Sequence, residues 1–486
     1  MKKVKWLFYI LAALFLVPVL LVSCLLIYWD LRTPPSFETD AVLNVETWSV
    51  TPSLDNIRTQ HNSNTDLIFF DGYFYLIHAQ TKWHLEDING ALVVKRSRDA
   101  REWEEVARIT VPETDVRDPK FAIIDGRLFM YFLPNDHFDP MPETTYWTAS
   151  DDGIAWEEPR EMDTMTVIYR NNDGTERYVT GGGWNMWRPK TYDGETWYVV
   201  ASGKKPVVGA QMEVTGTIEG DSVKEEGMMP LSVLFSSTDG IYWEEVSEVY
   251  SVFGSFESTL EFFPDGTAVS TMRISSMGTA GYAFGNPTAS TLIATAQPPY
   301  EEWSYAPSFI TRLDGATLFT IGDRMFAAGR NHMGPRFDMG NHMATKRTAL
   351  FEVKEDRLVH LFDLPSNGDT SYTGVVIRGD DIFVSYYTSP IDKDYPWVVG
   401  VCFLPKTEVR MARISASGLD VCGPDNRRGS LNHRGQYGTT IIIKTRNNIM
   451  TTKSSVGVLI RVVLSLVVGL LVIYPLFLYG RYFFIH

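Results

Sequence analysis

The chain has 486 residues, of which 44% are hydrophobic and 13% aromatic, enough for one large β-rich domain with additional segments. Its formal net charge of −15 at pH 7 argues against nucleic acid as a partner. The sequence holds neither a His-Glu-x-x-His motif nor cysteines at metal-ligand spacing, so we expect no metal centre and no cofactor.

The N-terminal segment, residues 1–30, is predicted to be a membrane anchor. An almost wholly apolar run over residues 6–29 follows three lysines and is long enough to cross a bilayer. Two alternatives stay open, a cleaved signal peptide and a lipoprotein cleavage box ending at Cys24. We expect an uncleaved helix whose lysines keep the N-terminus inside the cell.

Six short turns, each between two apolar runs, follow one another through the middle of the chain. Asp-Gly or Gly-Asp between such runs is a strong short-range signal for a β-hairpin. The six pairs are Asp71-Gly72, Asp125-Gly126, Asp193-Gly194, Asp265-Gly266, Gly322-Asp323 and Gly379-Asp380. We therefore expect six inner hairpins.

A second repeat interleaves with the first and reads Ser-x-Asp-(Gly/Ala)-x-x-Trp. It occupies residues 97–103, 150–156 and 237–243. The Asp is expected to accept hydrogen bonds from the turn's own amides, and the Trp to pack over the turn. Together the two repeats predict an all-β fold, a six-bladed β-propeller over residues 41–423 in which residues 41–48 supply the closing strand.

The C-terminal part differs from the repeats. Residues 424–455 are expected to form a basic juxtamembrane linker, and residues 456–480 a second transmembrane helix. We expect a membrane protein with the propeller on the extracytoplasmic side, and the lack of a usable Asn-x-Ser/Thr sequon indicates a bacterial source. Cys402 and Cys422 either form a disulfide or remain core thiols.

In a propeller, side chains near the start of each inner hairpin converge on one opening. Candidates there are Asn62, Arg117, Asp118, Arg188, Glu257, Arg273, Arg330 and Tyr372. A ring of arginines in an acidic protein argues for an anionic ligand. The alternatives are salt bridges between blades for each arginine, a structural pair of Glu257 with Arg273, and a core position for Tyr372.

Several segments over residues 55–415 resemble the sialidases and their Asp-box relatives, most closely uncharacterised members. They are residues 61–68, 115–120, 186–190, 257–260, 298–303, 327–330, 364–372 and 384–387. The resemblance implies a Tyr nucleophile, a Glu that accepts its proton, an Asp acid/base and three arginines that hold the sugar's carboxylate. By position, Tyr372 matches the nucleophile, Glu257 its partner, and Arg273 and Arg330 the second and third arginines.

Two family positions differ in this chain. Asn62 lies about where the first arginine is expected, and Arg58, Arg117 or Arg188 is a possible substitute. The early-loop aspartate is missing as well, which leaves His78, His84 or Asp118 as the acid. The predicted site comprises Tyr372, Glu257 and Asp118 as catalytic residues and Asn62, His84, Arg117, Arg188, Arg273 and Arg330 as substrate-binding residues.

Three functions are compatible with these observations. The first is a membrane-anchored exo-glycosidase that hydrolyses terminal acidic sugars, with membrane lipid contacted through two helices. The second is a non-catalytic propeller that binds an acidic glycan or scaffolds an envelope complex. The third is a furanosidase-like hydrolase, because residues 117–119 resemble a motif of five-bladed glycosidases, although six hairpins count against it.

Overall fold

The chain divides into two units, and one of them contains the repeats. The computed structural model describes residues 16–29, 31, 37, 39, 41–52, 56–84, 87–135, 144–170, 174–206, 228–251, 255–274, 291–308, 310–333 and 345–421. Residues 32–217 and 224–422 form the unit that carries the sheets. The other unit comprises residues 1–31, 218–223 and 423–486.

The predicted membrane segments are only partly described. Residues 16–29 form a helix. Among the helices that the structure describes, none combines the length and apolar character needed to cross a bilayer. The predicted linker, the predicted span over residues 456–480 and Cys422 lie outside the described residues.

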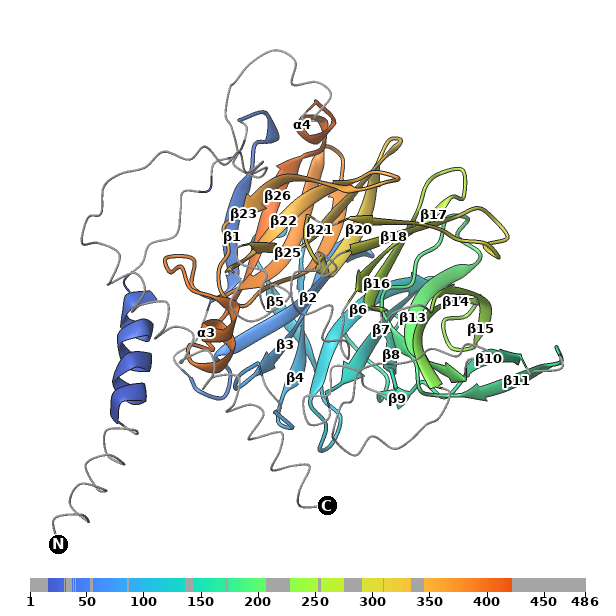
Figure 1. Ribbon diagram of the computed structural model, residues 1–486, viewed down its shortest axis with the longest axis horizontal. Helices are drawn as coiled ribbons and strands as arrows, with labels where there is room; N and C mark the ends of the chain where they lie inside the picture. Colours follow the sequence, from blue (N-terminus) through green and yellow to red (C-terminus); the bar gives the residue numbers. More distant parts are fainter. Residues whose placement is uncertain are drawn as a thin grey trace, which may run out of the picture. The chain divides into compact units, whose positions relative to one another are not determined.

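The described strands form six sheets, which confirms the predicted six-bladed propeller. Figure 1 shows the blades following one another in chain order, so that the orange strands of the last blade return to the blue strands of the first. Blades 1 and 2 contain β2 (His61–Phe70), β3 (Tyr73–Thr81), β4 (Ala91–Ser97) and β5 (Glu104–Ile109), then β6 (Val116–Ile124), β7 (Arg127–Pro134), β8 (Tyr146–Ser150) and β9 (Arg160–Glu161).

Blades 3 to 5 repeat this antiparallel order. Blade 3 contains β12 (Asn185–Met186), β13 (Trp197–Pro206), β14 (Met228–Ser237) and β15 (Trp243–Tyr250). Blades 4 and 5 contain β16 (Ser255–Phe262), β17 (Ala268–Ile274), β18 (Thr291–Ala296) and β19 (Ser304–Ser308), then β20 (Asp314–Ile321), β21 (Arg324–Met333), β22 (Thr345–Val353) and β23 (Leu358–Leu364). Blade 3 also carries an unpredicted hairpin, β10 (Met165–Arg170) and β11 (Glu176–Gly181), whose β10 pairs in parallel with β15.

Blade 6 closes the ring with strands from both ends of the propeller. It contains β24 (Thr370–Arg378), β25 (Asp381–Thr388), β26 (Glu408–Ser415) and β1 (Glu46–Thr51). The predicted closing strand is therefore present, although it begins at Glu46 because residues 41–43 form the 3-10 helix η1 (Ala41–Leu43). Two short helices, α3 (Trp397–Cys402) and α4 (Ala416–Val421), flank β26 in the sequence.

The core consists of apolar layers between neighbouring blades. Described residues form one such cluster at each of the six blade-to-blade interfaces. At the junction of the last blade with the first, the rings of Phe74 and Phe383 meet edge to face with centroids 4.9 Å apart. Burial of these two-sided sheets stabilises the ring as a whole, because each blade depends on both of its neighbours.

The Ser-x-Asp turns have the geometry that the repeat predicts. In blade 3, Asp239 Oδ1 accepts hydrogen bonds from the amides of Ile241 and Tyr242 at 2.8 and 2.9 Å, and Trp243 Nε1 donates to the carbonyl of Gly240. The turns at residues 97–103 and 150–156 repeat the aspartate contacts. These three segments are called Asp-box turns below.

A fourth Asp-box turn lies in an inner hairpin. Asp193 Oδ1 accepts hydrogen bonds from the amides of Glu195 and Thr196, both at 2.9 Å. Residues 191–197 read Thr-x-Asp-Gly-x-x-Trp, so the signal was in the sequence, but with Thr in place of Ser. Sequence analysis assigned this turn only as an Asp-Gly hairpin.

The Asp-box turns also connect blades. Tyr75 of blade 1 donates through its hydroxyl to the carbonyl of Asp152 in blade 2 at 3.0 Å. Tyr131 of blade 2 donates in the same way to Gly240 of blade 3 at 2.8 Å. Because each buried hydroxyl satisfies a turn carbonyl, the angle between consecutive blades is fixed by hydrogen bonds as well as by apolar packing.

The inner strands contain β-bulges where they approach the axis. Among the described inner strands, register shifts occur in β2, β6, β16, β20 and β24. Each shift contains one residue in the left-handed region: Asn64 (φ 54°), Asp118 (49°), Glu257 (48°), Gly315 (57°) and Tyr372 (50°). A bulge turns a side chain away from the regular alternation, and strained φ angles cluster at functional sites. These five positions are called the axial bulges below.

Candidate functional site

The axial bulges bring the predicted nucleophile and its predicted partner into contact. Tyr372 Oη donates a hydrogen bond to Glu257 Oε1 at 2.5 Å, although the two residues are 115 positions apart. The Tyr372 side chain is largely covered, with 8% of its surface exposed. A short bond between a phenol and a carboxylate is the arrangement needed to draw a proton from the phenol.

Glu257 is fixed by two further donors. Its Oε2 accepts a hydrogen bond from the backbone amide of Gly315 at 2.6 Å, and its Oε1 forms an ion pair with Arg273. Three donors from three blades thus orient one carboxylate toward the Tyr372 hydroxyl. Such convergence gives the carboxylate one position, which is the condition for directional proton transfer.

The phenol of Tyr372 is neutral at rest. Burial raises the pKa of Tyr372 well above its usual value, and the negative charges of Glu257 and Asp118 raise it further. Arg330 and Arg273 oppose this shift, with the guanidinium of Arg330 4.9 Å from the centre of the Tyr372 ring. An oxyanion therefore forms only when its proton can pass to Glu257.

Gly315 makes room for the tyrosine. A Cβ atom at this position would lie 2.6 Å from Tyr372 Cγ, a distance that real Cβ atoms essentially never show. The left-handed backbone of Gly315, at φ +57°, independently disfavours any other residue. At this one bulge the absence of a side chain serves the site, because the space is taken by the ring of Tyr372.

Asp118 lies beside the same carboxylate. Burial raises the pKa of Asp118, with Lys120 lowering it and Glu257 raising it. Asp118 also accepts a hydrogen bond from Asn64, the residue at the neighbouring bulge. A carboxylic acid with a raised pKa is suited to donate its proton to a leaving group.

Sequence analysis missed the lysine of this cluster. Burial lowers the pKa of Lys120 to about 8, while Asp118 and Asp66 act in the opposite direction. Its Nζ lies 4.3 Å from the ring of Trp187 and 6.0 Å from the ring of Tyr372. The available signal was its position, two residues after Asp118 within a segment already linked to the site.

Arg330 connects this cluster to a second one. Its Nε donates to the carbonyl of Thr370 at 2.7 Å and its Nη2 donates to Tyr387 Oη at 3.0 Å. The same guanidinium lies 3.5 Å from Asp314 and 3.6 Å from Asp369. Arg330 is therefore a buried cation between Tyr372 and a group of acidic side chains.

The second cluster surrounds Asp369. Its Oδ2 contacts His84 Nδ1 at 2.7 Å, and its Oδ1 accepts hydrogen bonds from Tyr387 Oη at 2.8 Å and Trp397 Nε1 at 3.0 Å. Burial would raise the pKa of Asp369, but His84, His61 and Arg330 hold it well below its usual value. His84, predicted as a substrate-binding residue, is thus next to a permanently ionised carboxylate.

Three other predicted binding residues make contacts away from Tyr372 Oη. Arg117 pairs with Asp115 at 2.8 Å and donates to the carbonyl of His84. Arg188 pairs with Asp66 at 2.6 Å and donates to Thr317 Oγ1 at 2.6 Å, which ties blades 1 and 5 together.

Asn62, at the position expected for the first arginine, is held within the ring closure. Its backbone amide donates to Thr407 Oγ1 at 2.7 Å, and its Oδ1 accepts a hydrogen bond from Gln80 at 3.0 Å. The side chain is fully buried. Asn62 thereby joins blade 1 to the start of β26, and it brings no positive charge to the candidate site.

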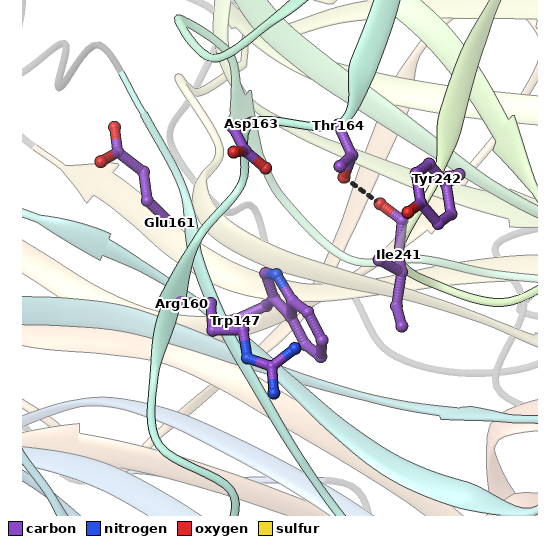
Figure 2. Close-up of a pocket in the computed structure, with 7 residues that line it drawn as sticks. All are labelled: Trp147, Arg160, Glu161, Asp163, Thr164, Ile241 and Tyr242. Atoms are coloured by element: carbon purple, nitrogen blue, oxygen red, sulfur yellow. Dashed lines mark hydrogen bonds between the residues drawn. The ribbon is translucent and has the colours of Figure 1, made fainter.

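A cavity of about 330 Å³ lies elsewhere, between blades 2 and 3. Figure 2 shows the residues that line it, namely Trp147, Arg160, Glu161, Asp163, Thr164, Ile241 and Tyr242. Arg160 stacks on Trp147, with its guanidinium 5.4 Å from the ring centre. None of the predicted site residues lines this cavity, so we place the candidate site at the axial bulges, where buried ionisable groups converge.

The chain has structural relatives but no match among family models or curated proteins. A protein of unknown function from Dyadobacter fermentans has a TM-score of 0.50 and 13% identity, and the match covers 76% of this chain and 99% of that one. The endosialidase of phage phi92 has a TM-score of 0.51 and 10% identity, with 85% of this chain and 76% of that chain covered.

A third similar structure is a mutant of Trypanosoma rangeli sialidase that displays trans-sialidase activity. Its TM-score is 0.50 at 11% identity, and the match covers 80% of this chain but only 61% of that one. At such low identity the likeness concerns the arrangement of strands. On the combined evidence of the six sheets, the Asp-box turns and these structural relatives, the chain has the six-bladed propeller fold of the sialidases.

Proposed function

We propose that this protein is an exo-glycosidase that hydrolyses a terminal acidic sugar at the axial bulges. The observation that carries the proposal is the 2.5 Å hydrogen bond from Tyr372 Oη to Glu257 Oε1, with Arg273 on the carboxylate and Arg330 on the phenol ring. A nucleophile, its base and two cations therefore share one small volume.

The choice of nucleophile fits an anionic substrate. A carboxylate nucleophile would repel the carboxylate of an acidic sugar, whereas the phenol of Tyr372 is neutral until Glu257 accepts its proton. Arg273 and Arg330 supply the positive charge that would attract the sugar's carboxylate. Both guanidiniums already contact protein carboxylates, Arg273 that of Glu257 and Arg330 that of Asp314. The substrate's carboxylate would therefore add to existing ion pairs.

The reaction would proceed in two steps. In the first, Tyr372 Oη attacks the anomeric carbon while its proton passes to Glu257, and the departing alcohol oxygen takes a proton from Asp118. In the second, Asp118 accepts a proton from water, whose oxygen attacks the same carbon and releases Tyr372, which regains its proton from Glu257. The sum is one glycosidic bond and one water exchanged for a free sugar and an alcohol.

A fluorogenic glycoside of N-acetylneuraminic acid tests the proposal with the full chain. We expect turnover by the wild type and a fall of about a thousandfold or more in Tyr372→Phe, because the nucleophile is lost. Tyr131→Phe is the matched control, since it also removes one buried hydroxyl hydrogen bond, but to a turn carbonyl between blades. Equal rates in the wild type and Tyr372→Phe would contradict the assignment.

A specific observation favours a second function, binding without turnover. Asn62 stands where a first arginine is expected and is committed to Thr407 and Gln80. Under this alternative the wild type would show saturable binding of free N-acetylneuraminic acid by calorimetry but no hydrolysis. Arg273→Gln should then weaken binding, while Tyr372→Phe should leave it nearly unchanged.

We also propose that the apolar segments at residues 6–29 and 456–480 hold the protein to a membrane, with the propeller on the extracytoplasmic side. The support is the composition of these segments and the lysines before the first one. The full chain should remain with membranes after an alkaline wash, and protease added to spheroplasts should cleave the propeller. Recovery in the soluble fraction would contradict the proposal.

A further inference from the structure

A group of two histidines and one aspartate lies beside the proposed catalytic cluster. One ligand atom each of His61, His84 and Asp369 lies within 4.8 Å of the other two, and Asp369 Oδ2 is 3.6 Å from His61 Nε2 and 2.7 Å from His84 Nδ1. His61 belongs to β2, His84 follows β3, and Asp369 precedes β24, so the first and last blades build the group together. Two imidazoles and a carboxylate are ligand types that zinc and related transition metals prefer.

The protonation of His61 leaves a lone pair pointing into this group. Its Nδ1 lies 2.9 Å from the carbonyl oxygen of Pro405, which can only accept, so Nδ1 carries the ring proton. Its Nε2 is buried, has no hydrogen-bond partner, and lies 3.6 Å from Asp369 Oδ2.

His61 Nε2 and Asp369 Oδ2, both electron-rich, therefore lie 3.6 Å apart inside the protein, and among the described residues no donor forms a hydrogen bond with His61 Nε2. Such an arrangement is costly unless a cation occupies the space. We propose that His61 Nε2, His84 Nδ1 and Asp369 Oδ2 bind a divalent transition metal of the zinc class. The metal replaces the proton that His84 and Asp369 share across 2.7 Å.

The surroundings of the three ligands have the pattern found around metal-binding residues. Histidine ligands commonly donate their second ring N–H to a carbonyl, as His61 does to Pro405, and ligating carboxylates receive hydrogen bonds. Here Asp369 Oδ1 accepts from Tyr387 and Trp397. Three protein ligands leave at least one coordination position open.

The electrostatics and access also permit a dication. Two guanidiniums near the group have carboxylate partners outside it: Arg117 pairs with Asp115 at 2.8 Å, and Arg330, which also lies 3.6 Å from Asp369, pairs with Asp314 at 3.5 Å. The His84 side chain is 14% exposed, so an ion can reach the group from solvent on the side of His84. The proposal does not depend on hydrolysis, because the three ligands are distinct from Tyr372 and Glu257.

Metal content measured on the full chain tests the proposal. The protein is purified without a polyhistidine tag, stripped with a chelator, dialysed against Zn²⁺ or Co²⁺, and analysed by mass spectrometry and visible absorption. We expect one equivalent of zinc and a cobalt absorption band in the wild type. His84→Ala, which changes the one partly exposed ligand, should bind zinc at least about tenfold more weakly.

Two control variants separate this site from adventitious histidines and from catalysis. His360→Ala should keep the full metal content, because His360 contacts Asp363 at 2.9 Å in an exposed pair without a second histidine. Tyr372→Phe should also keep it. Zinc should raise the thermal midpoint of the wild type and His360→Ala, but not that of His84→Ala.

Three outcomes would overturn the proposal. They are a wild type with well below one equivalent after dialysis, equal zinc in the wild type and His84→Ala, or a zinc-dependent thermal shift that survives in His84→Ala. A loss of hydrolysis in Tyr372→Phe with unchanged zinc would leave both proposals standing. Zinc binding without any hydrolysis would support the metal site and contradict the glycosidase.

Discussion

The Asp-box turns and the axial bulges are both tight backbone features, but their carboxylates accept hydrogen bonds from different sources, which are near in the sequence for the turns and far away for the bulges. Asp239 accepts amides two and three residues ahead in its own exposed turn. Glu257 accepts from Tyr372 and from Gly315, which lie 115 and 58 residues away. A carboxylate that is hydrogen-bonded within its own turn lets that turn recur beside any neighbour. A carboxylate that is hydrogen-bonded by residues of other blades makes its bulge depend on several blades at once.

Because of this difference, the Asp-box turns contribute to the stability of the fold, and the axial bulges contribute the groups of the candidate site. The outer turns repeat because in each of them an Asp side chain accepts hydrogen bonds from the amides of its own turn. The bulges carry five different residues because each contributes a different group to one site. If this comparison holds, substitutions at the bulges should damage the whole assembly, and substitutions at the turns should cost little and locally.

The largest effect is expected for Gly315→Ala at an axial bulge. The new methyl group would collide with Tyr372 Cγ, 2.6 Å away, and the backbone would remain left-handed. We expect a loss of about 4 kcal/mol in the free energy of unfolding, measured with urea, from overpacking and backbone strain together. Any remaining folded protein should also lose hydrolysis.

Gly322→Ala is the matched control, in the turn that follows the other end of β20. Its φ is +60°, close to that of Gly315, but its Cβ would meet nothing within 4 Å. This variant should lower the free energy of unfolding by about 1 kcal/mol, because only the left-handed backbone conformation disfavours the alanine. Equal losses for the two variants would show that the ring of Tyr372 imposes no steric demand on Gly315.

The second largest effect is a loss of stability in mild acid. Burial lowers the pKa of both His78 and His332 to about 3, so both are neutral when folded and take up protons on unfolding below about pH 6.5. Their stabilisation is present above pH 6.5 and is lost as pH falls toward 3. Between pH 7.5 and pH 5.5, the two histidines together should lower the free energy of unfolding by about 3 kcal/mol.

Urea unfolding at the two pH values measures this loss. In His78→Gln, which removes one of the two groups, the difference between pH 7.5 and 5.5 should shrink by about 1.4 kcal/mol, whatever the variant's absolute stability. An unchanged difference would mean that His78 titrates normally in the folded protein.

A smaller effect is expected at an Asp-box turn. Asp239→Ala removes the acceptor of two turn amides that remain exposed to water, and we expect a loss of about 1 to 2 kcal/mol. Hydrolysis and metal content should be unaffected in the folded fraction. A loss as large as that of Gly315→Ala would remove the distinction between the two regions.

The smallest effect is expected on the surface of the first Asp-box turn. Arg101 pairs with Glu46, and its guanidinium lies 3.7 Å from the ring of Trp48, but both charged side chains are nearly half exposed. Arg101→Ala should cost no more than about 1 kcal/mol by thermal unfolding, because exposed pairs are screened. A larger cost would make this contact part of the ring closure.

The architecture could be predicted because its signals are local. Each Asp-Gly turn and each Asp-box phrase is fixed by a few consecutive residues, and β1 was predicted from its position ahead of the first repeat. The hairpin β10–β11 was not predicted, although Asp173-Gly174 lies between its two strands in the sequence. The fourth Asp-box turn at Asp193 escaped notice because Thr replaces Ser there.

The contacts of the site were less predictable because they join distant blades. The resemblance to sialidases suggested Tyr372, Glu257 and the two arginines. It covered the segment that contains Lys120 without giving that residue a role, and it gave no indication of the amide of Gly315 at Glu257. The pairing of His84 with Asp369 spans 285 residues, and neither residue lies in a metal-binding motif. Only the closure of the ring, which places blade 6 beside blade 1, brings these groups together.

The join between β1 and β26 has a mechanical consequence. Glu46 pairs with Arg413, and Gly418 of α4 lies against Val42 of η1, so the chain enters and leaves blade 6 at the same end of an antiparallel pair. Tension applied to the two flanking segments would therefore load the ladder one hydrogen bond at a time, as in peeling, instead of shearing all bonds together. Under such a pull the seam between β1 and β26 would part first, and the remaining blades would open only after it.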